Sequence, residues 1–354
     1  MKEKELVCGN VALSEAAIRA GCRYYFGYPI TPQNEVTSYM SLRMDEVGGV
    51  FLQAESELAS INMVFGAALT GAKAMTTSSS PGISLMQEGI SYLAGCELPA
   101  VIVNVMRGGP GLGNIAPSQS DYFQAVKGGG HGDYRLLVFA PSTVQEVADY
   151  TYTAFSKAGE YRMQVMILMD GLLGQMMEPV YFPDMSASFS YRNDWALTGC
   201  ENREPRSIKS LLLEEGALER HNENLQKKYD KIRKKEVLYD TFLADDADVL
   251  LAAFGFCGRL CRKAVEELRK KGIKAGLFRP ITLWPFPGEV FAGLSKKPAK
   301  IFCVEMNAGQ MVEDIMLYAD DKNKVRFVGR TGGGVPSVSE IVTAVIRARD
   351  EKNI

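Results

Sequence analysis

Short apolar runs typical of β-strands alternate along most of this chain with longer amphipathic runs typical of helices. Such alternation indicates a parallel sheet covered by helices, because two parallel strands need a long crossover connection and a helix usually provides it. Strand-like runs in the first half lie at 24–27, 50–52, 101–105, 136–139 and, as the last of them, 165–169. Helix-like runs lie at 14–20, 83–93 and 144–158. We therefore predict an α/β fold.

The alternation stops over residues 183–245 and then resumes. This segment contains the charged run RHNENLQKKYDKIRKKE, which starts at Arg220. A dense mixture of charges is typical of a solvated helix. Strand-like and helix-like runs return from residue 249 in a shorter series. We expect a first domain at 1–185, a linker with an exposed charged helix at 186–245, and a smaller α/β domain at 246–354.

The composition argues against several classes of protein. With 46% hydrophobic residues the chain can bury large cores, and its net charge of -2 gives no electrostatic reason to bind nucleic acid or an anionic membrane. No apolar run approaches the roughly 20 residues of a membrane span, and the first residues lack the apolar stretch of a signal peptide. We expect its partners to be proteins and small molecules.

The cysteines do not resemble a disulfide framework, because they are odd in number, seven, and thinly spread. A reducing cytoplasm fits them better. Only Cys257 and Cys261 are close, and their spacing places both on one face of a predicted helix. Iron–sulfur clusters need several thiolates at close spacing. We therefore predict two small buried residues at this position, and no cluster or other protein metal site on this chain.

The run QAESELASINMVFGAALTGAKAMTTSSSPG, residues 53–82, is the strongest candidate for a functional site. Glu55 and Glu57 stand at the mouth of an apolar helix, where a desolvated carboxylate is costly unless it has a role. The plainer interpretation is that both acids only complement the dipole of the first helical turn. The hydroxyl-rich residues 76–80 follow the helix and are expected to form a rim that faces a ligand.

Two loops leave alternatives open at this stage. Residues 111–116, GLGNIA, fit the dinucleotide-binding pattern G-x-G-x-x-A, although Pro110 and Pro117 bracket them and no apolar helix follows. In the second half, Glu305, Asn307 and Gln310 form a polar cluster. This cluster is either an interface or ordinary turn chemistry.

Four segments taken together resemble one enzyme family. They are YPITP at 28–32, the run at 53–82, VNVMRGGP at 103–110 and GHGD at 130–133. With them, the chain resembles the alpha subunit of 2-oxoacid:ferredoxin oxidoreductases over nearly its whole length. The resemblance implies a pyrimidine-binding domain of thiamine diphosphate enzymes, a parallel sheet with helices on both faces, followed by a smaller transketolase C-terminal-like α/β domain.

The resemblance also implies a cofactor, thiamine diphosphate, whose aminopyrimidine needs a glutamate partner. Counting nine residues back from Gly66, as the family's spacing requires, assigns this catalytic role to Glu57, with Glu55 as the fallback. The same comparison implies cofactor contacts from Tyr28, Pro29 and Ile30.

Two residues are expected to bind the substrate. Thr31 matches the family's threonine that hydrogen-bonds the 2-oxoacid, and Arg107 matches its arginine that holds the carboxylate, a task suited to the fork of a guanidinium. The simpler alternatives are a turn threonine between two prolines and a surface arginine.

One motif of thiamine enzymes is missing. The Gly-Asp-Gly motif that holds the diphosphate through Mg²⁺ has only Asp170-Gly171 as a counterpart, without a suitable asparagine after it. The resemblance therefore implies that a beta subunit carries the diphosphate and Mg²⁺ half of the site. It further implies a gamma subunit and a ferredoxin-like delta subunit, with [4Fe-4S] clusters on the partners, and ferredoxin as the electron acceptor. We expect this chain to be inactive alone.

Two runs, KGGGHGDYRLLVFAPSTVQEVADYT and DGLLGQMMEPV, most resemble the branched-chain members of the family. These oxidise 3-methyl-2-oxobutanoate with coenzyme A to isobutyryl-CoA, CO₂ and reduced ferredoxin. The 2-oxoglutarate and pyruvate branches, another thiamine diphosphate enzyme and a non-catalytic scaffold remain as alternatives.

Overall fold

A seven-stranded sheet forms the centre of the first domain, in the order β12-β6-β7-β5-β4-β2-β3. The computed structural model describes residues 4–183 and 194–350. Neighbouring strands of this sheet are parallel except for the edge pair β12 and β6. The strands are β2 (Tyr24–Gly27), β3 (Val50–Gln53), β4 (Ala74–Ser78), β5 (Ala100–Met106), β6 (Leu137–Phe139), β7 (Gln164–Asp170) and β12 (Thr282–Trp284). The predicted parallel sheet is thus confirmed.

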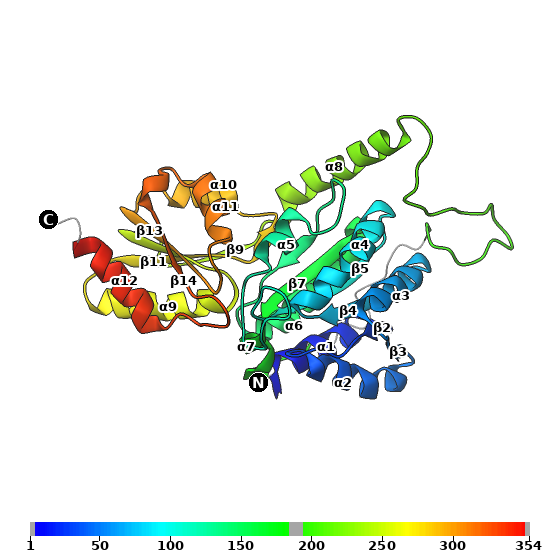
Figure 1. Ribbon diagram of the computed structural model, residues 1–354, viewed down its shortest axis with the longest axis horizontal. Helices are drawn as coiled ribbons and strands as arrows, with labels where there is room; N and C mark the ends of the chain where they lie inside the picture. The colour runs from blue at the N-terminus through cyan, green and yellow to red at the C-terminus, as the bar shows by residue number, and fades with distance from the viewer. Residues whose placement is uncertain (1–3, 184–193, 351–354) are drawn as a thin grey trace.

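Helices cover this sheet in two groups (Figure 1): α1 packs against α2 and α6, whereas α3 packs against α4. A short antiparallel pair, β1 (Glu5–Cys8) and β8 (Met177–Val180), joins the two ends of the domain. The helical elements are α1 (Gly9–Arg19), α2 (Asn34–Arg43), η1 (Asp45–Val47), α3 (Glu57–Leu69), α4 (Ser80–Gly95), α5 (Tyr122–Lys127), α6 (Val144–Tyr161) and α7 (Gly171–Gln175).

The prediction that the run at 165–169 supplies the last strand of this sheet was wrong. Strand β12 comes from beyond residue 280 and pairs antiparallel with β6. The three residues of β12 carry no readable periodicity, so a strand of this length has no sequence signal. The edge of the first sheet is therefore completed by a segment that follows β11 of the second sheet.

The second sheet has the order β14-β13-β10-β11-β9, parallel except for β9. Figure 1 shows α9 and α12 on one side of it and α10 and α11 on the other. Cys257 and Cys261 are both buried on α9, as predicted. The elements are β9 (Tyr239–Phe242), β10 (Val249–Ala252), α9 (Gly255–Lys270), β11 (Ala275–Pro280), α10 (Gly288–Leu294), β13 (Lys300–Glu305), α11 (Met311–Tyr318), η2 (Lys322–Lys324), β14 (Val325–Gly329) and α12 (Val338–Asp350).

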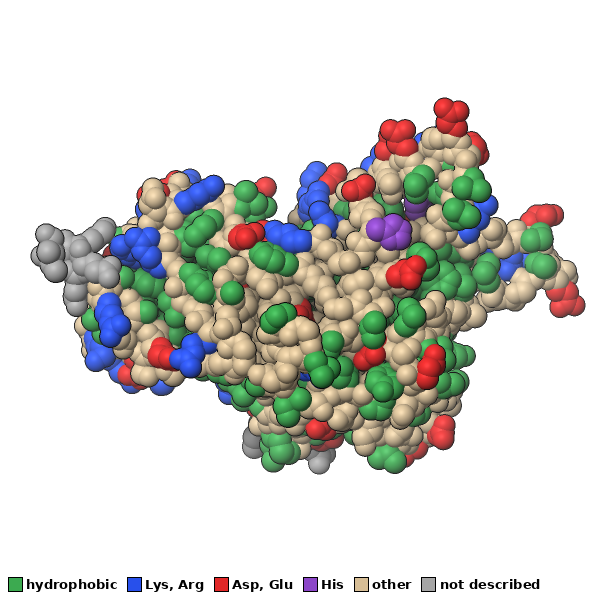
Figure 2. Space-filling view, viewed as in Figure 1, with side chains coloured by type: hydrophobic (Ala, Val, Ile, Leu, Met, Phe, Trp, Pro, Cys, Tyr) green, Lys and Arg blue, Asp and Glu red, His purple; other side chains and the backbone are tan. Residues whose placement is uncertain are grey.

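The charged run folds as α8 (Ala217–Lys235), which an extended arm precedes (Figure 1). Acidic side chains gather near the start of this helix (Figure 2). The helix is not fully exposed as expected, because Leu225, Tyr229 and Ile232 on one face are buried. Tyr229 packs edge-on against Trp284 of β12, with ring centroids 5.7 Å apart. The boundary expected at 185–186 lies outside the described residues. No helix in the described parts of the chain is long and apolar enough to cross a membrane.

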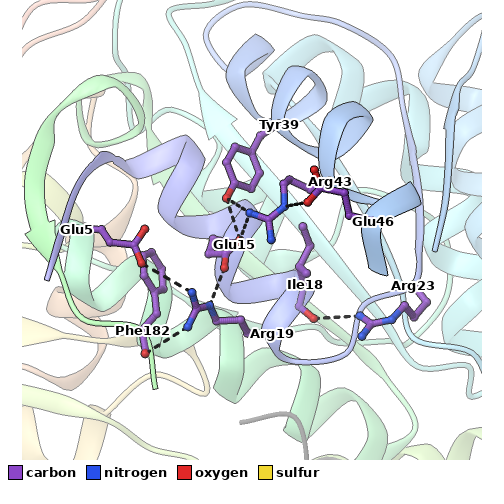
Figure 3. Close-up of polar contacts among 9 residues, drawn as sticks. All are labelled: Glu5, Glu15, Ile18, Arg19, Arg23, Tyr39, Arg43, Glu46 and Phe182. Atoms are coloured by element: carbon purple, nitrogen blue, oxygen red, sulfur yellow. Dashed lines mark hydrogen bonds and ion pairs between the residues drawn. The ribbon is translucent and has the colours of Figure 1, made fainter. Parts of the chain in front are cut away.

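A buried carboxylate ties α1 to α2 (Figure 3). Glu15 is only 5% exposed and accepts hydrogen bonds from Arg19, at 2.6 Å, and from the Tyr39 hydroxyl, at 2.8 Å. Arg43 Nη1 lies 3.4 Å from Glu15 Oε2, the oxygen that also accepts from Tyr39. Two guanidinium groups compensate the desolvation of this acid. Glu15 therefore serves packing and shows what a structural buried acid in this chain requires.

A polar seam joins the two domains. Residues 118–123 lie against the loop 305–311, where Gln119 and Asn307 are fully or almost fully buried. The Asn307 amide donates to the Gln119 carbonyl at 2.9 Å, and the Gln310 amide donates to the Ser120 carbonyl at 2.6 Å. Both alternatives for the 305–310 cluster hold in part: Glu305 and Asn307 accept from amides of their own turn, and Asn307 and Gln310 bond to the first domain of the same chain.

A second contact across the seam is a bidentate ion pair. Arg279 of β11 donates to both carboxylate oxygens of Glu146 on α6, at 2.9 and 2.8 Å. The arginine side chain is 7% exposed and the glutamate 22%. Such pairs combine charge with a fixed geometry.

We expect Arg279→Ala to lower the free energy of unfolding by about 3 kcal/mol, because it leaves a largely desolvated Glu146 without its cation. Urea unfolding followed by fluorescence measures the change. As a control, Lys263→Ala removes one partner of an exposed pair with Glu266 on α9 and should leave the midpoint unchanged. Equal effects of the two variants would contradict the assigned role of Arg279.

Candidate active site

The carboxyl ends of β2, β3, β4 and β5 meet at one edge of the first sheet, because these strands are parallel neighbours. Four chain segments leave the sheet at this edge: residues 28–33, the start of α3, the start of α4 and the loop 107–117. Ligand sites of open α/β sheets form at such edges. The residues predicted from the sequence lie in the first, second and fourth of these segments.

Glu57 is the first residue of α3, and Ser56 caps the helix by accepting from the Ala59 amide at 3.2 Å. The Glu57 residue is 4% exposed, and the Ser78 hydroxyl donates to its Oε1 at 3.3 Å. In the part of the chain that the structure describes, no lysine or arginine pairs with it, unlike Glu15. Glu55 is exposed. Burial therefore separates the two candidates and favours Glu57.

Gly82 in the first turn of α4 makes room for the Glu57 carboxyl. A Cβ at this position would lie 2.4 Å from Glu57 Oε1 and 2.0 Å from the Ser78 hydroxyl. Any larger residue would displace the acid, so the glycine is required by close approach. The helix α4 thus begins against Glu57 and, through Ser80, against Arg107.

Arg107 stands at the end of β5 and is 7% exposed. Its Nη1 donates to the Thr31 carbonyl and its Nη2 to the Leu112 carbonyl, each at 3.1 Å. The Nε of the same side chain is buried and has no hydrogen-bond partner in the described structure. A buried guanidinium with an unsatisfied N–H donor can bind an anionic ligand.

The structure brings Thr31 and Arg107 together, since the two loops share this hydrogen bond. The Thr31 hydroxyl accepts from the Asn34 amide at 3.4 Å, and the residue is half-buried. Tyr28 and Pro29 are exposed and Ile30 is half-buried. These three residues form the open lip of the edge, away from the protein's own core.

Asp121, which lies just before α5, was not predicted from the sequence as a site residue. Its Oδ2 accepts from the Ser80 hydroxyl at 2.6 Å and from the Asn104 amide at 2.9 Å. Burial raises the pKa of this carboxyl above its usual range, although both hydrogen bonds oppose the shift. The only available signal was the polar string SQSD at 118–121, which carries no pattern of a known site.

The glycine-rich loop does not form a dinucleotide site. The Gly108 amide donates to the Ala116 carbonyl at 2.9 Å, and the Asn114 amide donates back to Gly108 at 2.9 Å. The loop closes on itself, and the next helix starts only at Tyr122. No helix N-terminus therefore follows the glycines to bind a pyrophosphate.

Asp170, the remnant of the missing motif, is a helix cap. Its Oδ1 accepts from the amides of Leu172 and Leu173, at 3.1 Å each, and its Oδ2 is buried without a partner in the described structure. Burial raises the pKa of this carboxyl to about 6, against the opposing backbone hydrogen bonds. Among the described residues, no group of three or more His, Cys, Asp or Glu is arranged to hold a metal ion.

The raised pKa of Asp170 predicts a pH dependence of stability. Between about pH 4 and 6 the unfolded chain loses this proton while the folded chain keeps it, so the folded state loses stability as the pH rises. The loss reaches about 3 kcal/mol above pH 6. Asp170→Asn should flatten this decline, since it cannot ionise. Urea midpoints of both proteins at pH 4, 5, 6 and 7 measure it, and parallel pH curves would contradict the prediction.

Two protein-family comparisons match most of the chain. Residues 15–240 match the family described as pyruvate flavodoxin/ferredoxin oxidoreductase, thiamine diphosphate-binding, and residues 247–341 match pyruvate:ferredoxin oxidoreductase core domain II. The ketoisovalerate oxidoreductase subunit VorB of Methanothermobacter thermautotrophicus is 48% identical over 96% of this chain and 97% of its own length. The 2-oxoglutarate synthase subunit KorA of the same organism is 35% identical over 98% of this chain and 99% of its own.

Solved structures agree with this result. A 2-oxoglutarate:ferredoxin oxidoreductase from Magnetococcus marinus superposes with a TM-score of 0.88 at 27% identity. The match covers 98% of this chain, which spans 65% of that longer one. A split-gene transketolase matches with a TM-score of 0.59 at 14% identity and so supports the fold alone. The chain belongs to the family of 2-oxoacid:ferredoxin oxidoreductases, as a subunit of the alpha type.

Proposed function

We propose that this chain is the alpha subunit of an enzyme that decarboxylates 3-methyl-2-oxobutanoate oxidatively with coenzyme A, giving isobutyryl-CoA, CO₂ and reduced ferredoxin. The identity of 48% to a ketoisovalerate oxidoreductase subunit, against 35% to a 2-oxoglutarate synthase subunit, supports this branch. The observation that carries the proposal is the pairing of a buried acid without a cation, Glu57, with a buried arginine that has a spare donor, Arg107, at one sheet edge.

Glu57 fits the aminopyrimidine of thiamine diphosphate. Its carboxyl is desolvated at a helix start, with one hydroxyl donor from Ser78 and the space left by Gly82. A carboxyl in such surroundings can share a proton with a ring nitrogen. When bound, the cofactor supplies a carbon nucleophile for the 2-oxo group. Glu57 would hold the proton at the pyrimidine, and Tyr28, Pro29 and Ile30 would contact the cofactor.

Arg107 and Thr31 would hold the 2-oxoacid. The guanidinium binds the carboxylate and is kept in place by the carbonyls of Thr31 and Leu112. A positioned cation fixes the keto carbon where it can react. Thr31 is half-buried at the same edge, and its hydroxyl can donate to the keto oxygen of the substrate.

The remaining parts of the enzyme are assigned to partners. A beta subunit would provide Mg²⁺ and the diphosphate half of the site, and gamma and delta subunits with [4Fe-4S] clusters would lead electrons to ferredoxin. All seven cysteines of this chain are free, and the two close ones, Cys257 and Cys261, are buried. This state supports a reducing cytoplasm. The proposed domains are 1–185 and 246–354 with a linker between them, and β12 of the second segment completes the sheet of the first.

The complex purified through this chain should reduce a viologen dye when thiamine diphosphate, coenzyme A and a 2-oxoacid are present. We expect kcat/KM for 3-methyl-2-oxobutanoate to exceed that for pyruvate and 2-oxoglutarate at least tenfold. The second carboxylate of 2-oxoglutarate needs another cation, and the methyl group of pyruvate makes fewer apolar contacts than an isopropyl group. Preference for 2-oxoglutarate or pyruvate would agree with the family but assign the chain to the branch that uses that substrate. Dye reduction that does not require thiamine diphosphate would contradict the proposed function.

In the same complex, Glu57→Gln should lower 2-oxoacid-dependent dye reduction by about 10²-fold or more, because the amide cannot exchange the proton. Glu55→Gln is the matched control, since this acid is exposed two residues away, and should stay within about twofold of the unchanged enzyme. Full activity of the Glu57 variant would remove this residue from the catalytic site and favour a scaffold role.

A further inference from the structure

We propose that Asp121 is a positioning residue for Arg107, and that the second domain holds it in that place. The inference deepens the proposed function, because it rests on Arg107 binding the carboxylate of the 2-oxoacid. Asp121 itself need not touch the substrate. It acts through a hydrogen-bonded chain that runs from the loop 305–311 to the backbone of Arg107.

The first link of this chain is the Ser80 hydroxyl, which lies between Asp121 and Arg107. It is 2.6 Å from the Asp121 Oδ2 and 3.3 Å from the Arg107 carbonyl, and the Arg107 amide donates to it at 3.0 Å. A hydroxyl has one proton to donate. The shorter contact to a carboxylate takes that proton, and the oxygen lone pairs then face the Arg107 amide.

Asn104 closes the same network from the sheet. Its side chain is fully buried, donating to Asp121 Oδ2 at 2.9 Å and accepting from the Ser80 amide at 3.0 Å. One carboxylate oxygen therefore orders both the start of α4 and the end of β5. Without it, the Ser80 proton turns to the Arg107 carbonyl, and the backbone from which the guanidinium extends loses its anchor.

The second link joins Asp121 to the second domain. Residues on both sides of the aspartate are held there: the Gln310 side chain donates to the Ser120 carbonyl at 2.6 Å and accepts from the Phe123 amide at 2.8 Å. The Gln119 side chain accepts from the Met306 amide at 3.1 Å. The contacts of the second domain with residues 119–123 thus fix the position of Asp121.

A further contact couples the opposite side of the arginine loop to the same domain. The side-chain amide of Asn114 donates to the Gly332 carbonyl at 2.9 Å. The loop 107–117 is therefore held from the second domain directly at Asn114 and indirectly through Asp121. This arrangement assigns the second domain a part in binding the 2-oxoacid, although its own side chains do not reach Arg107 in the described contacts.

The test measures three constants of the assembled complex in each variant: KM for 3-methyl-2-oxobutanoate, kcat, and KM for coenzyme A. Asp121→Ala should raise KM for 3-methyl-2-oxobutanoate about five- to twentyfold, the range expected for the loss of one charged hydrogen bond. Both kcat and KM for coenzyme A should stay within about threefold of their values in the unchanged enzyme. The inhibition constant of N,N-dimethyloxamate, an unreactive isostere of this substrate, should rise in parallel. Asp121→Asn keeps an oxygen acceptor and should restore KM to within about threefold.

Four further variants locate the effect. Gln310→Ala, in the second domain, should raise the same KM in the same direction but less. In an Arg107→Ala background, Asp121→Ala should add less than about twofold, because two residues acting through one contact are not additive. Asp149→Ala removes an exposed carboxylate from α6 and should leave KM unchanged. Ser80→Ala breaks the same chain at its centre and replaces Asp121→Ala if that variant does not assemble.

The outcomes separate this inference from the proposed function. Unchanged KM in Asp121→Ala and Ser80→Ala, with a raised KM in Arg107→Ala, would overturn the inference alone. Full additivity in the double variant, or an Asp121→Asn effect as large as that of alanine, would also overturn it. Unchanged KM in Arg107→Ala would end both the inference and the assigned role of Arg107.

Discussion

The cost of burying a carboxylate is the constraint on which this structure depends. Each buried acid must find a cation, several hydrogen-bond donors or a ligand. Glu15 has two arginines and a tyrosine, and Glu305 accepts from the amides of Met311 and Val312 at 2.8 and 3.0 Å. Glu57 has a single hydroxyl in the described structure. This difference marks it as an acid that awaits a partner from outside the chain.

The same constraint explains how the two domains are joined. The seam is polar and buried, so every donor there must be matched by an acceptor on the other side. The side chains of Gln119, Asn307 and Gln310 bond to backbone groups across the seam, and Arg279 pairs with Glu146. A matched polar seam has one low-energy register, whereas an apolar seam could slide. The segment 118–123 therefore connects the second domain rigidly to the sheet edge that carries Arg107.

Sequence patterns predicted the long elements well and the short or distant ones poorly. The apolar runs of β5 and β7 were readable because a strand buried on both faces is continuously hydrophobic. Strand β12 was not, since three residues show no period. The charged helix α8 was predicted, but its buried face was missed. Leu225, Tyr229 and Ile232 recur at helical spacing within a run dominated by charge, and their packing partner Trp284 lies far along the chain.

The candidate site divides in the same way. The sequence by itself determined which residue types stand at the strand ends, because chain order sets these positions. It thereby determined that an apolar helix starting with acids and an arginine after a later strand lie at the same edge of the sheet. Only the tertiary structure decided that Glu57 is buried and Glu55 exposed, that Gly82 clears space for one of them, and that Asp121 connects Arg107 to the second domain. These features depend on contacts between segments tens to hundreds of residues apart, and local patterns carry no information about such contacts.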